Sequence, residues 1–236
     1  MAKEIAILMA AGLGTRMAPL TKTKPKPLIK VIDKPMIETV LDALTKRGVS
    51  HLYVVVGYLS EQFNYLTEKY DNLSIVENKE YKTINNISSI HAVTDVMRDS
   101  NCFVCEADLF IPNPDVLSTE LTKSCYFGKM VKGYSGDWLF TLDESGRIIH
   151  IGKGGTDCYN MCGVSYFLKE DAAAIADAVD ARYSEPGYED LFWDEVVDSI
   201  LNKIDLIVHP IEHDQIIEID TIEELENESR KFSKDN

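Results

Sequence analysis

The chain has 236 residues, the size of one large domain or two small ones, and can bury a core without disulfide or metal cross-links. Its 24 lysine and arginine residues face 39 aspartate and glutamate residues, which gives a net charge of −15. This acidic balance argues against binding to nucleic acid or to an anionic membrane surface, so any phosphate site needs a local basic cluster. No apolar run is long enough to predict a transmembrane helix.

Alternating strand and helix patterns fill the first half of the chain. Apolar runs predict strands at 4–10, 51–58, 74–78 and 102–108, and helical spacing predicts helices at 36–47, 60–70 and 87–98. This order predicts an α/β fold, with a mostly parallel, Rossmann-like sheet flanked by helices. Ligands of such sheets bind beyond the carboxyl ends of the strands, so the residues after 10, 58, 78 and 105 are expected to share one site.

The second half has a different pattern. Short strands are predicted at 124–131, 137–143, 147–152 and 162–168, helices at 169–183 and 189–202, strands at 204–212 and 215–220, and a last helix from about 221. We expect a single domain over 1–236. Its core would comprise about 1–123 and 203–232, and a mostly antiparallel part at about 124–202 would cover the active site.

Two further features bear on location. The first residues lack the basic and then apolar pattern of a signal peptide, and the five cysteines are an odd number. Cys102 and Cys105 form one C-x-x-C within an apolar run, where residues three apart on a strand point to opposite faces and cannot share a metal. We expect reduced cysteines and a cytoplasmic location.

The strongest functional signal lies at residues 8–35. The predicted strand ends at Ala10, and Ala11, Gly12 and Gly14 form a turn with few side chains, whose backbone N–H groups can approach an anion. Thr15 and Arg16 add a hydroxyl and a guanidinium group, and Lys26 lies between two prolines. Six of the 24 basic residues fall within 16–34, which supplies the local anion site. The alternative is an ordinary glycine turn before a solvated basic loop. The motifs G-x-x-x-x-G-K-[ST] and G-x-G-x-x-G are both absent.

The pattern A-A-G-x-G-T-R followed by P-K resembles the signature of the nucleotidyltransferases that activate sugar phosphates and related small phosphates. The resemblance runs along the whole chain and is closest to the branch of bacterial cytidylyltransferases that act on phosphocholine, through segments 54–70, 85–90, 191–198 and 216–220. It implies that Gly12, Gly14 and Thr15 cradle the phosphates of a nucleoside triphosphate. It also implies that Arg16 and Lys26 are catalytic, because they neutralise those phosphates.

Three carboxylates are candidates for a magnesium site. Asp108 closes a predicted strand, and Glu218 and Asp220 are two apart on another, so they share a face. Hard oxygen ligands beside a phosphate site suit Mg²⁺, and the resemblance implies that an aspartate after a central strand and a C-terminal acidic residue bind it. The alternatives are a strand-end cap for Asp108 and a solvent-exposed face for the other two.

Polar residues after the third and fourth predicted strands are candidates for binding the nucleotide base. Amide side chains can donate to and accept from a base edge, as cytosine requires, and the N-N pair resembles the phosphocholine branch, which favours CTP. The alternative is that the two asparagines only cap the following helix. These candidates are Gly57, Tyr58, Asn78, Asn85, Asn86 and Ser88.

The two tryptophans each neighbour an acidic residue, a combination that suits an ammonium group. Packing in the core is the alternative for Trp193 and Phe192. The candidates for binding this second substrate are Asp137, Trp138, Lys153, Tyr166, Asp190, Trp193 and Asp194. At Lys129, Lys132 and Lys153 the sequence differs from that of the phosphocholine branch. These lysines would bind the phosphoryl group of the substrate, or they would indicate that the substrate is another zwitterion, such as 2-aminoethylphosphonate or phosphoethanolamine.

Together these features predict a Mg²⁺-dependent enzyme that transfers CMP from CTP to a small amine-bearing phosphate, with phosphocholine as the first choice. The alternatives are 2-aminoethylphosphonate or phosphoethanolamine, then a sugar 1-phosphate, and last a non-catalytic nucleotide-binding subunit. The expected reaction is in-line attack on the α-phosphorus, which needs no general base because the attacking oxygen is already anionic. The sequence leaves the oligomeric state open, a homo-oligomer included.

Overall fold

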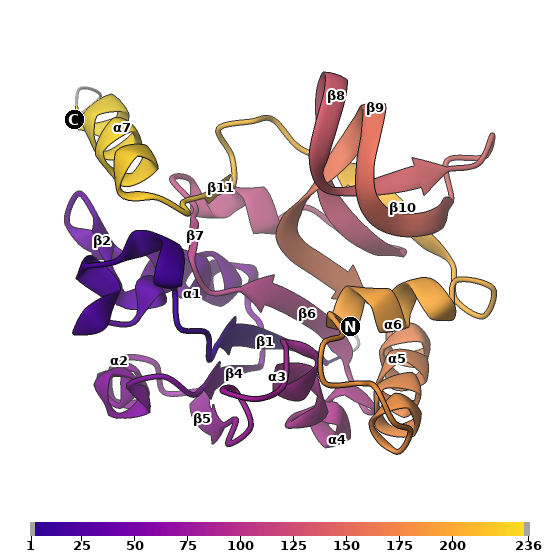
Figure 1. Ribbon diagram of the computed structural model, residues 1–236, viewed down its shortest axis with the longest axis horizontal. Coiled ribbons are helices and arrows are strands. Elements are labelled where there is room, and N and C mark those ends of the chain that lie inside the picture. Colours follow the sequence, from indigo (N-terminus) through magenta and orange to yellow (C-terminus); the bar gives the residue numbers. More distant parts are fainter. Residues whose placement is uncertain (1–2, 234–236) are drawn as a thin grey trace.

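A seven-stranded sheet forms the centre of the molecule in the computed structural model, which describes residues 3–233 (Figure 1). Each strand pairs in parallel with its neighbours, except that β9 runs antiparallel to both β6 and β8. The predicted mostly parallel sheet is therefore confirmed. In spatial order the strands are β10 (Leu206–Pro210), β8 (Ser124–Leu142), β9 (Ile148–Phe167), β6 (Asn101–Glu106), β1 (Glu4–Ala10), β4 (His51–Val56) and β5 (Leu73–Glu77).

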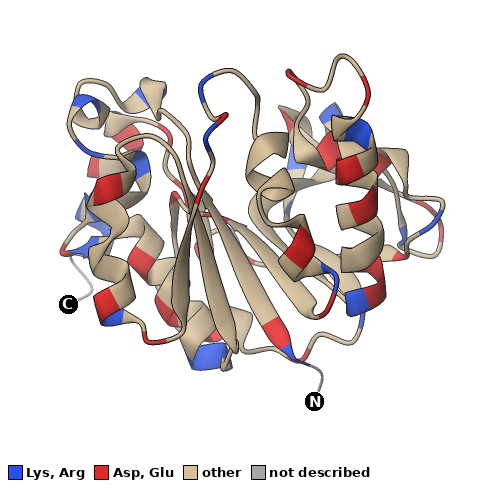
Figure 2. Cartoon of the chain, turned by 90° about the horizontal axis from the view of Figure 1, so that it is seen from below, with Lys and Arg blue, Asp and Glu red and all other residues tan. Residues whose placement is uncertain are grey.

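Helices cover both faces of the sheet, because its central strands are apolar on both sides. Along β1, Ala6 and Leu8 pack toward α1 (Met36–Arg47) and α2 (Tyr65–Lys69), and Ile5 and Ile7 pack toward the other helices. Figure 2 shows these strands, almost free of charged residues, between helices on either side. The helices of the second face are α3 (Ile87–His91), α4 (Thr94–Met97), α5 (Lys169–Tyr183) and α6 (Trp193–Ser199).

Two short sheets and the last helix complete the fold. The pairs are β2 (Lys30–Val31) with β3 (Lys34–Pro35) and β7 (Leu109–Phe110) with β11 (Ile217–Glu218). The helix α7 (Ile222–Phe232) packs by Leu225 and Phe232 on a third apolar cluster. Five short 3₁₀ helices lie within the described range: η1 (Thr15–Met17), η2 (Leu20–Lys22), η3 (Lys26–Leu28), η4 (Ser60–Phe63) and η5 (Pro114–Leu117).

Several predicted boundaries are wrong. The helix expected at 60–70 is split into η4 and α2, the one at 87–98 into α3 and α4, and the one at 189–202 is limited to α6. The four strands expected between 124 and 168 are two long ones, β8 and β9, which stay paired through glycine-rich stretches. Shifts in their register mark bulges, and Gly133 and Gly154 there have φ values of 81° and 80°, which favour glycine.

Two other expectations can be checked on this fold. Cys102 and Cys105 point to opposite faces of the sheet and are both buried, as predicted. Within residues 3–233, no helix is long and apolar enough to span a bilayer.

Candidate active site

A cavity of about 290 Å³ opens at the carboxyl ends of β1, β5 and β6, where the sequence predicts the ligand site. One wall is the glycine-rich turn after β1, and the opposite wall is the segment from Asn78 to Ser89. Acidic side chains from β6 and β11 line the floor. The lining residues are Met9, Ala10, Ala11, Gly12, Gly14, Arg16, Lys26, Pro27, Asn78, Tyr81, Ile84, Asn85, Asn86, Ser88, Ser89, Glu106, Asp108 and Glu218.

The lack of a side chain at residue 14 removes strain from the glycine-rich turn. Gly14 has φ 62°, and a Cβ placed there would lie 2.8 Å from Cβ of Lys26. The hydroxyl of Thr21 donates to the Gly14 carbonyl at 2.9 Å and fixes the turn against η2. The backbone of Ala11, Gly12 and Gly14 is thereby held at the cavity wall, which suits an anionic ligand.

Lys26 is the centre of a buried charge network. Its side chain is only 7% exposed, and its Nζ atom lies 2.6 Å from both Oδ2 of Asp108 and Oδ1 of Asp220. Arg16, with a side chain that is 69% exposed, lies 2.7 Å from Oδ2 of Asp220. Burial would lower the pKa of Lys26, but the charge of Asp108 and the hydrogen bonds to both carboxylates outweigh it and raise that pKa. Lys26 is therefore a fixed positive charge beside the glycine-rich turn.

The pairing of β7 with β11 brings two of the three predicted metal ligands, Asp108 and Glu218, near each other. Asp108 lies in the turn before β7, and Glu218 on β11 is the register partner of Leu109 on β7. Burial, and then the charges of Asp220 and Asp108, raise the pKa of Glu218 to about 7. Burial would also raise the pKa of Asp220, but Lys26 and Arg16 outweigh it and lower that pKa.

The chemistry of these donors fits Mg²⁺, because all are carboxylate oxygens at the edge of the predicted phosphate site. In the described part of the chain, however, no three His, Cys, Asp or Glu side chains converge as a ligand set. The ammonium of Lys26 lies within 2.6 Å of both Asp108 and Asp220 and bridges these two carboxylates.

A fourth carboxylate, that of Glu106, was not among the residues predicted from the sequence. It lines the main cavity and also a cavity of about 10 Å³ behind it, which Trp193 and Asp194 line as well. Burial raises the pKa of Glu106 well above its usual value, and the charges of Asp108 and Glu218 add to this effect. The available signal was its spacing, since residues two apart on a strand share a face and Asp108 was already a candidate.

The asparagines of the far wall are held by hydrogen bonds within the wall and to the segment around the start of α6. Asn78 donates to the hydroxyls of Ser88 and Ser89 at 2.8 and 3.2 Å. Asn85 donates through its side chain to the carbonyl of Asp190 at 2.9 Å, and Oδ1 of Asn86 accepts from the backbone N–H of Trp193 at 2.9 Å. Neither Asn85 nor Asn86 caps α3 with its side chain. They connect the cavity wall to the segment before α6 instead.

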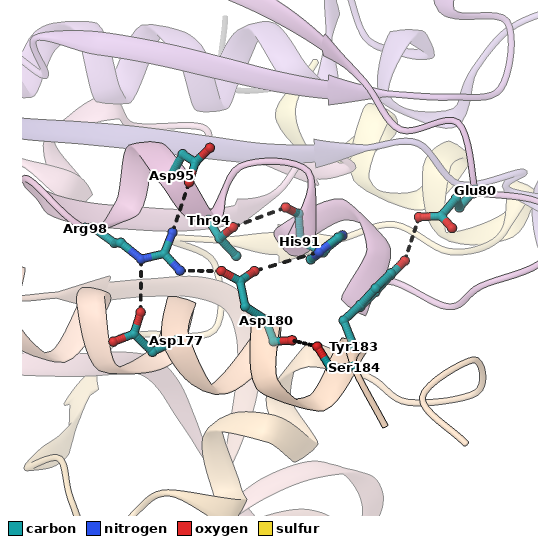
Figure 3. Close-up of polar contacts among 9 residues, drawn as sticks. All are labelled: Glu80, His91, Thr94, Asp95, Arg98, Asp177, Asp180, Tyr183 and Ser184. Atoms are coloured by element: carbon teal, nitrogen blue, oxygen red, sulfur yellow. Dashed lines mark hydrogen bonds and ion pairs between the residues drawn. The ribbon is translucent and has the colours of Figure 1, made fainter. Parts of the chain in front are cut away.

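Polar contacts join α5 to the α3–α4 region and to Glu80 in this wall (Figure 3). Arg98 donates to Asp177 at 3.0 Å and also to Asp180. The hydroxyl of Tyr183, near the end of α5, donates to Glu80 at 2.8 Å, within the wall segment itself. The position of the wall therefore depends on helix packing far from the glycine-rich turn.

Three predicted nucleotide contacts lie outside the cavity lining. Thr15 is exposed at the start of η1 and does not line the cavity. The hydroxyl of Tyr58 donates to the carbonyls of Thr21 and Lys22 at 2.9 and 3.2 Å, and so supports the basic loop from outside. Gly57 does not line the cavity either, but its lack of a Cβ gives room to Tyr81, which does.

Tyr166 needs a correction among the predicted substrate contacts. Its hydroxyl donates to Glu4 at 3.1 Å and accepts from Asn101 at 2.8 Å, at the amino ends of β1 and β6. The cavity is at the carboxyl ends of these strands. Tyr166 lies at the opposite edge of the sheet, because β9 runs antiparallel to β6. Tyr166 belongs to the core.

Trp193 and Asp194 are also buried, which corrects their expected place at an open substrate pocket. The Trp193 ring is 3% exposed and packs between Tyr126 and Phe167, with centroids 6.1 and 6.0 Å away, so the core-packing alternative holds for it. Asp194 accepts a hydrogen bond from the Tyr126 hydroxyl at 3.0 Å, and burial raises its pKa to about 7. Both residues line only the small cavity behind Glu106.

The remaining candidates lie on β8, on β9 and before α6, outside the lining of the main cavity. The ammonium of Lys153 lies 5.0 Å from the centroid of the Trp138 ring. Asp137 accepts from Asn160 at 3.3 Å, and Asp190 is exposed. Lys129 donates to the carbonyl of Ile216, next to β11.

Comparison with known proteins decides the family. Residues 5–123, about half of the chain, match the model of the family described as nucleotidyl transferase. The chain belongs to this family. The match begins in β1 and contains the glycine-rich turn, Lys26 and Asp108, so the family that residues 8–35 predict is confirmed, and with it the expectation of an enzyme.

Relatives of this nucleotidyltransferase include cytidylyltransferases that match along nearly the whole chain. It is 53% identical to a 2-aminoethylphosphonate cytidylyltransferase of Lancefieldella rimae, over 94% of this chain and 91% of that protein. It is 31% identical to a choline-phosphate cytidylyltransferase of Streptococcus pneumoniae, over 93% and 94% of the two chains. A choline-phosphate cytidylyltransferase of Haemophilus influenzae is 28% identical over 97% of both.

Solved structures agree with this placement of the nucleotidyltransferase. The structure of CTP:phosphocholine cytidylyltransferase from Streptococcus pneumoniae has a TM-score of 0.88 at 30% identity, over 98% of this chain and 99% of that one. A structure described as a glucose-1-phosphate thymidylyltransferase from Bacillus anthracis has a TM-score of 0.78 at 14% identity, over 97% and 94%, and shows the shared fold alone.

Proposed function

We propose that this nucleotidyltransferase transfers CMP from CTP to 2-aminoethylphosphonate and releases pyrophosphate. The observation that carries the proposal is the 53% identity, over 94% of the chain, to a protein named for that activity. The cavity supports it, because a glycine-rich turn, two cationic side chains and a group of carboxylates lie together at the carboxyl edge of the sheet.

The reaction would need little covalent chemistry from the protein. An anionic phosphonate oxygen attacks the α-phosphorus of CTP in line, a new P–O bond forms, and the bond to the bridging oxygen breaks as pyrophosphate leaves. The backbone of the glycine-rich turn would hold the triphosphate. Arg16 and Lys26 would neutralise the charge that develops on the pyrophosphate.

Magnesium is part of this proposal. Asp108, Glu218 and Asp220 would hold Mg²⁺, which supplies positive charge to the phosphate oxygens when bound. Because Lys26 already bonds Asp108 and Asp220, its ammonium would have to turn toward the phosphates as the carboxylates take the ion. The lysine would then act on the leaving group.

Phosphocholine, the first choice from the sequence, becomes the second candidate. The relatives that carry the name choline-phosphate cytidylyltransferase are 31% and 28% identical, against 53% for the 2-aminoethylphosphonate enzyme. The burial of Trp193 also removes one of the two rings expected to surround a choline group. Phosphoethanolamine shares the primary amine of 2-aminoethylphosphonate and is a further acceptor to compare.

The test is pyrophosphate release with Mg²⁺, comparing CTP with UTP, ATP and GTP and comparing 2-aminoethylphosphonate, phosphoethanolamine, phosphocholine and glucose 1-phosphate as acceptors. We expect turnover with CTP and the highest kcat/KM with 2-aminoethylphosphonate. Lys26→Met should abolish turnover, whereas Lys24→Met, an exposed lysine of the same loop, should not. Turnover with a sugar phosphate would contradict the proposal, and CTP binding without turnover would favour a non-catalytic subunit.

A further inference from the structure

A cationic side chain of the protein itself lies against an aromatic pair formed by Trp138 and Phe192. The ammonium of Lys153 is 5.0 Å from the centroid of Trp138 and 5.2 Å from that of Phe192. The two rings meet edge to face, with centroids 5.3 Å apart and planes at 64°. Both distances are within the range of a cation–π interaction, so one ammonium is shared by two rings.

The backbone holds this group in place. Trp138 on β8 and Lys153 on β9 are register partners across the strand pair. Phe192 directly precedes α6, and its N–H donates to Glu195 at 2.7 Å. Lys153 therefore reaches the rings from a fixed position rather than from a loose loop.

The aromatic pair is joined to the wall of the main cavity. The residue after Phe192, Trp193, donates through its backbone N–H to Asn86, which lines the cavity. Asn85, its neighbour in the wall, donates to the carbonyls of Glu189 and Asp190. Three hydrogen bonds thus connect the cavity wall to the segment that carries Phe192.

We propose that Lys153 is a specificity-determining residue that excludes acceptors with a trimethylammonium group by covering the ring faces of Trp138 and Phe192. This inference rests on the proposed function, because it concerns the acceptor of the same reaction. A trimethylammonium group has no N–H to donate and binds best to open aromatic faces. Here it would have to displace a tethered ammonium from those faces and would meet its positive charge.

A primary ammonium group is not affected in the same way. It carries three N–H donors and is satisfied by carboxyl or carbonyl oxygens, and the cavity offers carboxyl oxygens at Glu106. The other aromatic side chains expected around the amine offer no substitute cage, because Trp193 and Tyr166 are buried in the core. The lysine would therefore separate the two classes of acceptor by penalising only one of them.

The test compares kcat/KM for phosphocholine and for 2-aminoethylphosphonate in four proteins. In Lys153→Met, which keeps the length of the side chain and loses its charge, we expect the ratio of phosphocholine to 2-aminoethylphosphonate to rise about three- to tenfold. Lys153→Arg, which restores a cation, should return the ratio to the wild-type value. Lys123→Met, an exposed lysine just before β8, should leave it unchanged.

A binding measurement makes the result independent of turnover. Tryptophan fluorescence of each protein is titrated with tetramethylammonium chloride, with sodium chloride as the control for ionic strength. We expect saturable binding in Lys153→Met, its loss when Trp138→Phe is added, and none in the wild type. If the wild type uses no amine-bearing acceptor, the proposed function fails, but this titration still decides the role of Lys153.

Two outcomes would overturn the proposal. An unchanged ratio in Lys153→Met, with tetramethylammonium binding no better than in the wild type, would show that the aromatic pair does not select acceptors. An equal fall of kcat/KM with every acceptor would show that Lys153 grips the phosphoryl or phosphonate group that all of them share.

Discussion

The ammonium of Lys26 and the carboxylate of Asp108 are 82 residues apart in the chain and 2.6 Å apart in the fold. The contact joins the loop after β1 to the turn after β6, and Asp220 closes the network from the C-terminal segment at the same distance from Lys26. One buried cation thereby holds three distant segments of the chain together. It also shields two carboxylates that would otherwise repel each other.

The first prediction concerns this network. Lys26→Met should lower the free energy of unfolding by on the order of 3 kcal/mol, because Asp108 and Asp220 lose a buried partner. It should also make Mg²⁺ a stronger stabiliser than in the wild type, since the carboxylates no longer have to release an ammonium first. The measurement is the shift of Tm with increasing MgCl₂.

Lys24→Met is the control, because Lys24 is exposed in the same loop. Its Tm and its response to Mg²⁺ should match those of the wild type. If Mg²⁺ shifts the Tm of Lys26→Met no more than that of the wild type, the three carboxylates are not the magnesium site.

The second prediction compares two glycines of the same turn. Gly14→Ala should destabilise the protein by about 1–3 kcal/mol, because residue 14 has φ 62° and the new Cβ would lie 2.8 Å from Cβ of Lys26. Gly12→Ala should cost much less, since no atom lies within 4 Å of its new Cβ. Urea denaturation measures both, and equal losses would contradict this description of the turn.

Local patterns were sufficient where an element is long and its burial is regular. The strand at 4–10 and the helix at 36–47 were predicted at the bounds of β1 and α1, because apolar residues recur there with one clear period. Short elements carry no such signal. The pairing of β7 with β11, two residues each, brings Asp108 to Glu218, and no periodicity could have shown it.

The candidate site was predicted best where a residue follows directly from a strand end, as with Ala10, Ala11 and Gly12. The errors come from relations that a single segment does not contain. Alternation along β9 indicates which face Tyr166 occupies, but only the antiparallel pairing with β6 decides at which end of the sheet it lies. Asp194, next to Trp193 in the sequence, suggested a substrate pocket. In the fold, however, the Trp193 ring is buried by packing on Tyr126 and Phe167, which are distant in the sequence.

The third prediction tests the new place of Tyr166. Tyr166→Phe removes the hydrogen bonds to Glu4 and Asn101 and should lower the free energy of unfolding by about 1 kcal/mol. KM and kcat for both substrates should stay at their wild-type values, because the hydroxyl lies at the edge of the sheet opposite the cavity. A selective rise of KM for the acceptor would instead support the predicted role of Tyr166 in binding that substrate.

The fourth prediction concerns the buried carboxyl of Asp194. Burial raises its pKa from an ordinary value near 3.8 to about 7, so between these values the folded protein holds a proton that the unfolded chain has released. The stability that this proton gives is complete below about pH 4 and is lost as the pH rises through about 7. The loss amounts to at most about 4 kcal/mol.

Asp194→Asn removes this dependence and keeps an oxygen that accepts from the Tyr126 hydroxyl. Urea denaturation at several values between pH 4 and pH 8 should therefore show the variant gaining stability relative to the wild type as the pH rises. Asp190→Asn removes an exposed aspartate from the same segment, and its difference from the wild type should stay constant over that range. A pH-independent difference for Asp194→Asn as well would mean that the Asp194 carboxyl is ionised in the folded protein. Its bond with Tyr126 would then be that of a carboxylate.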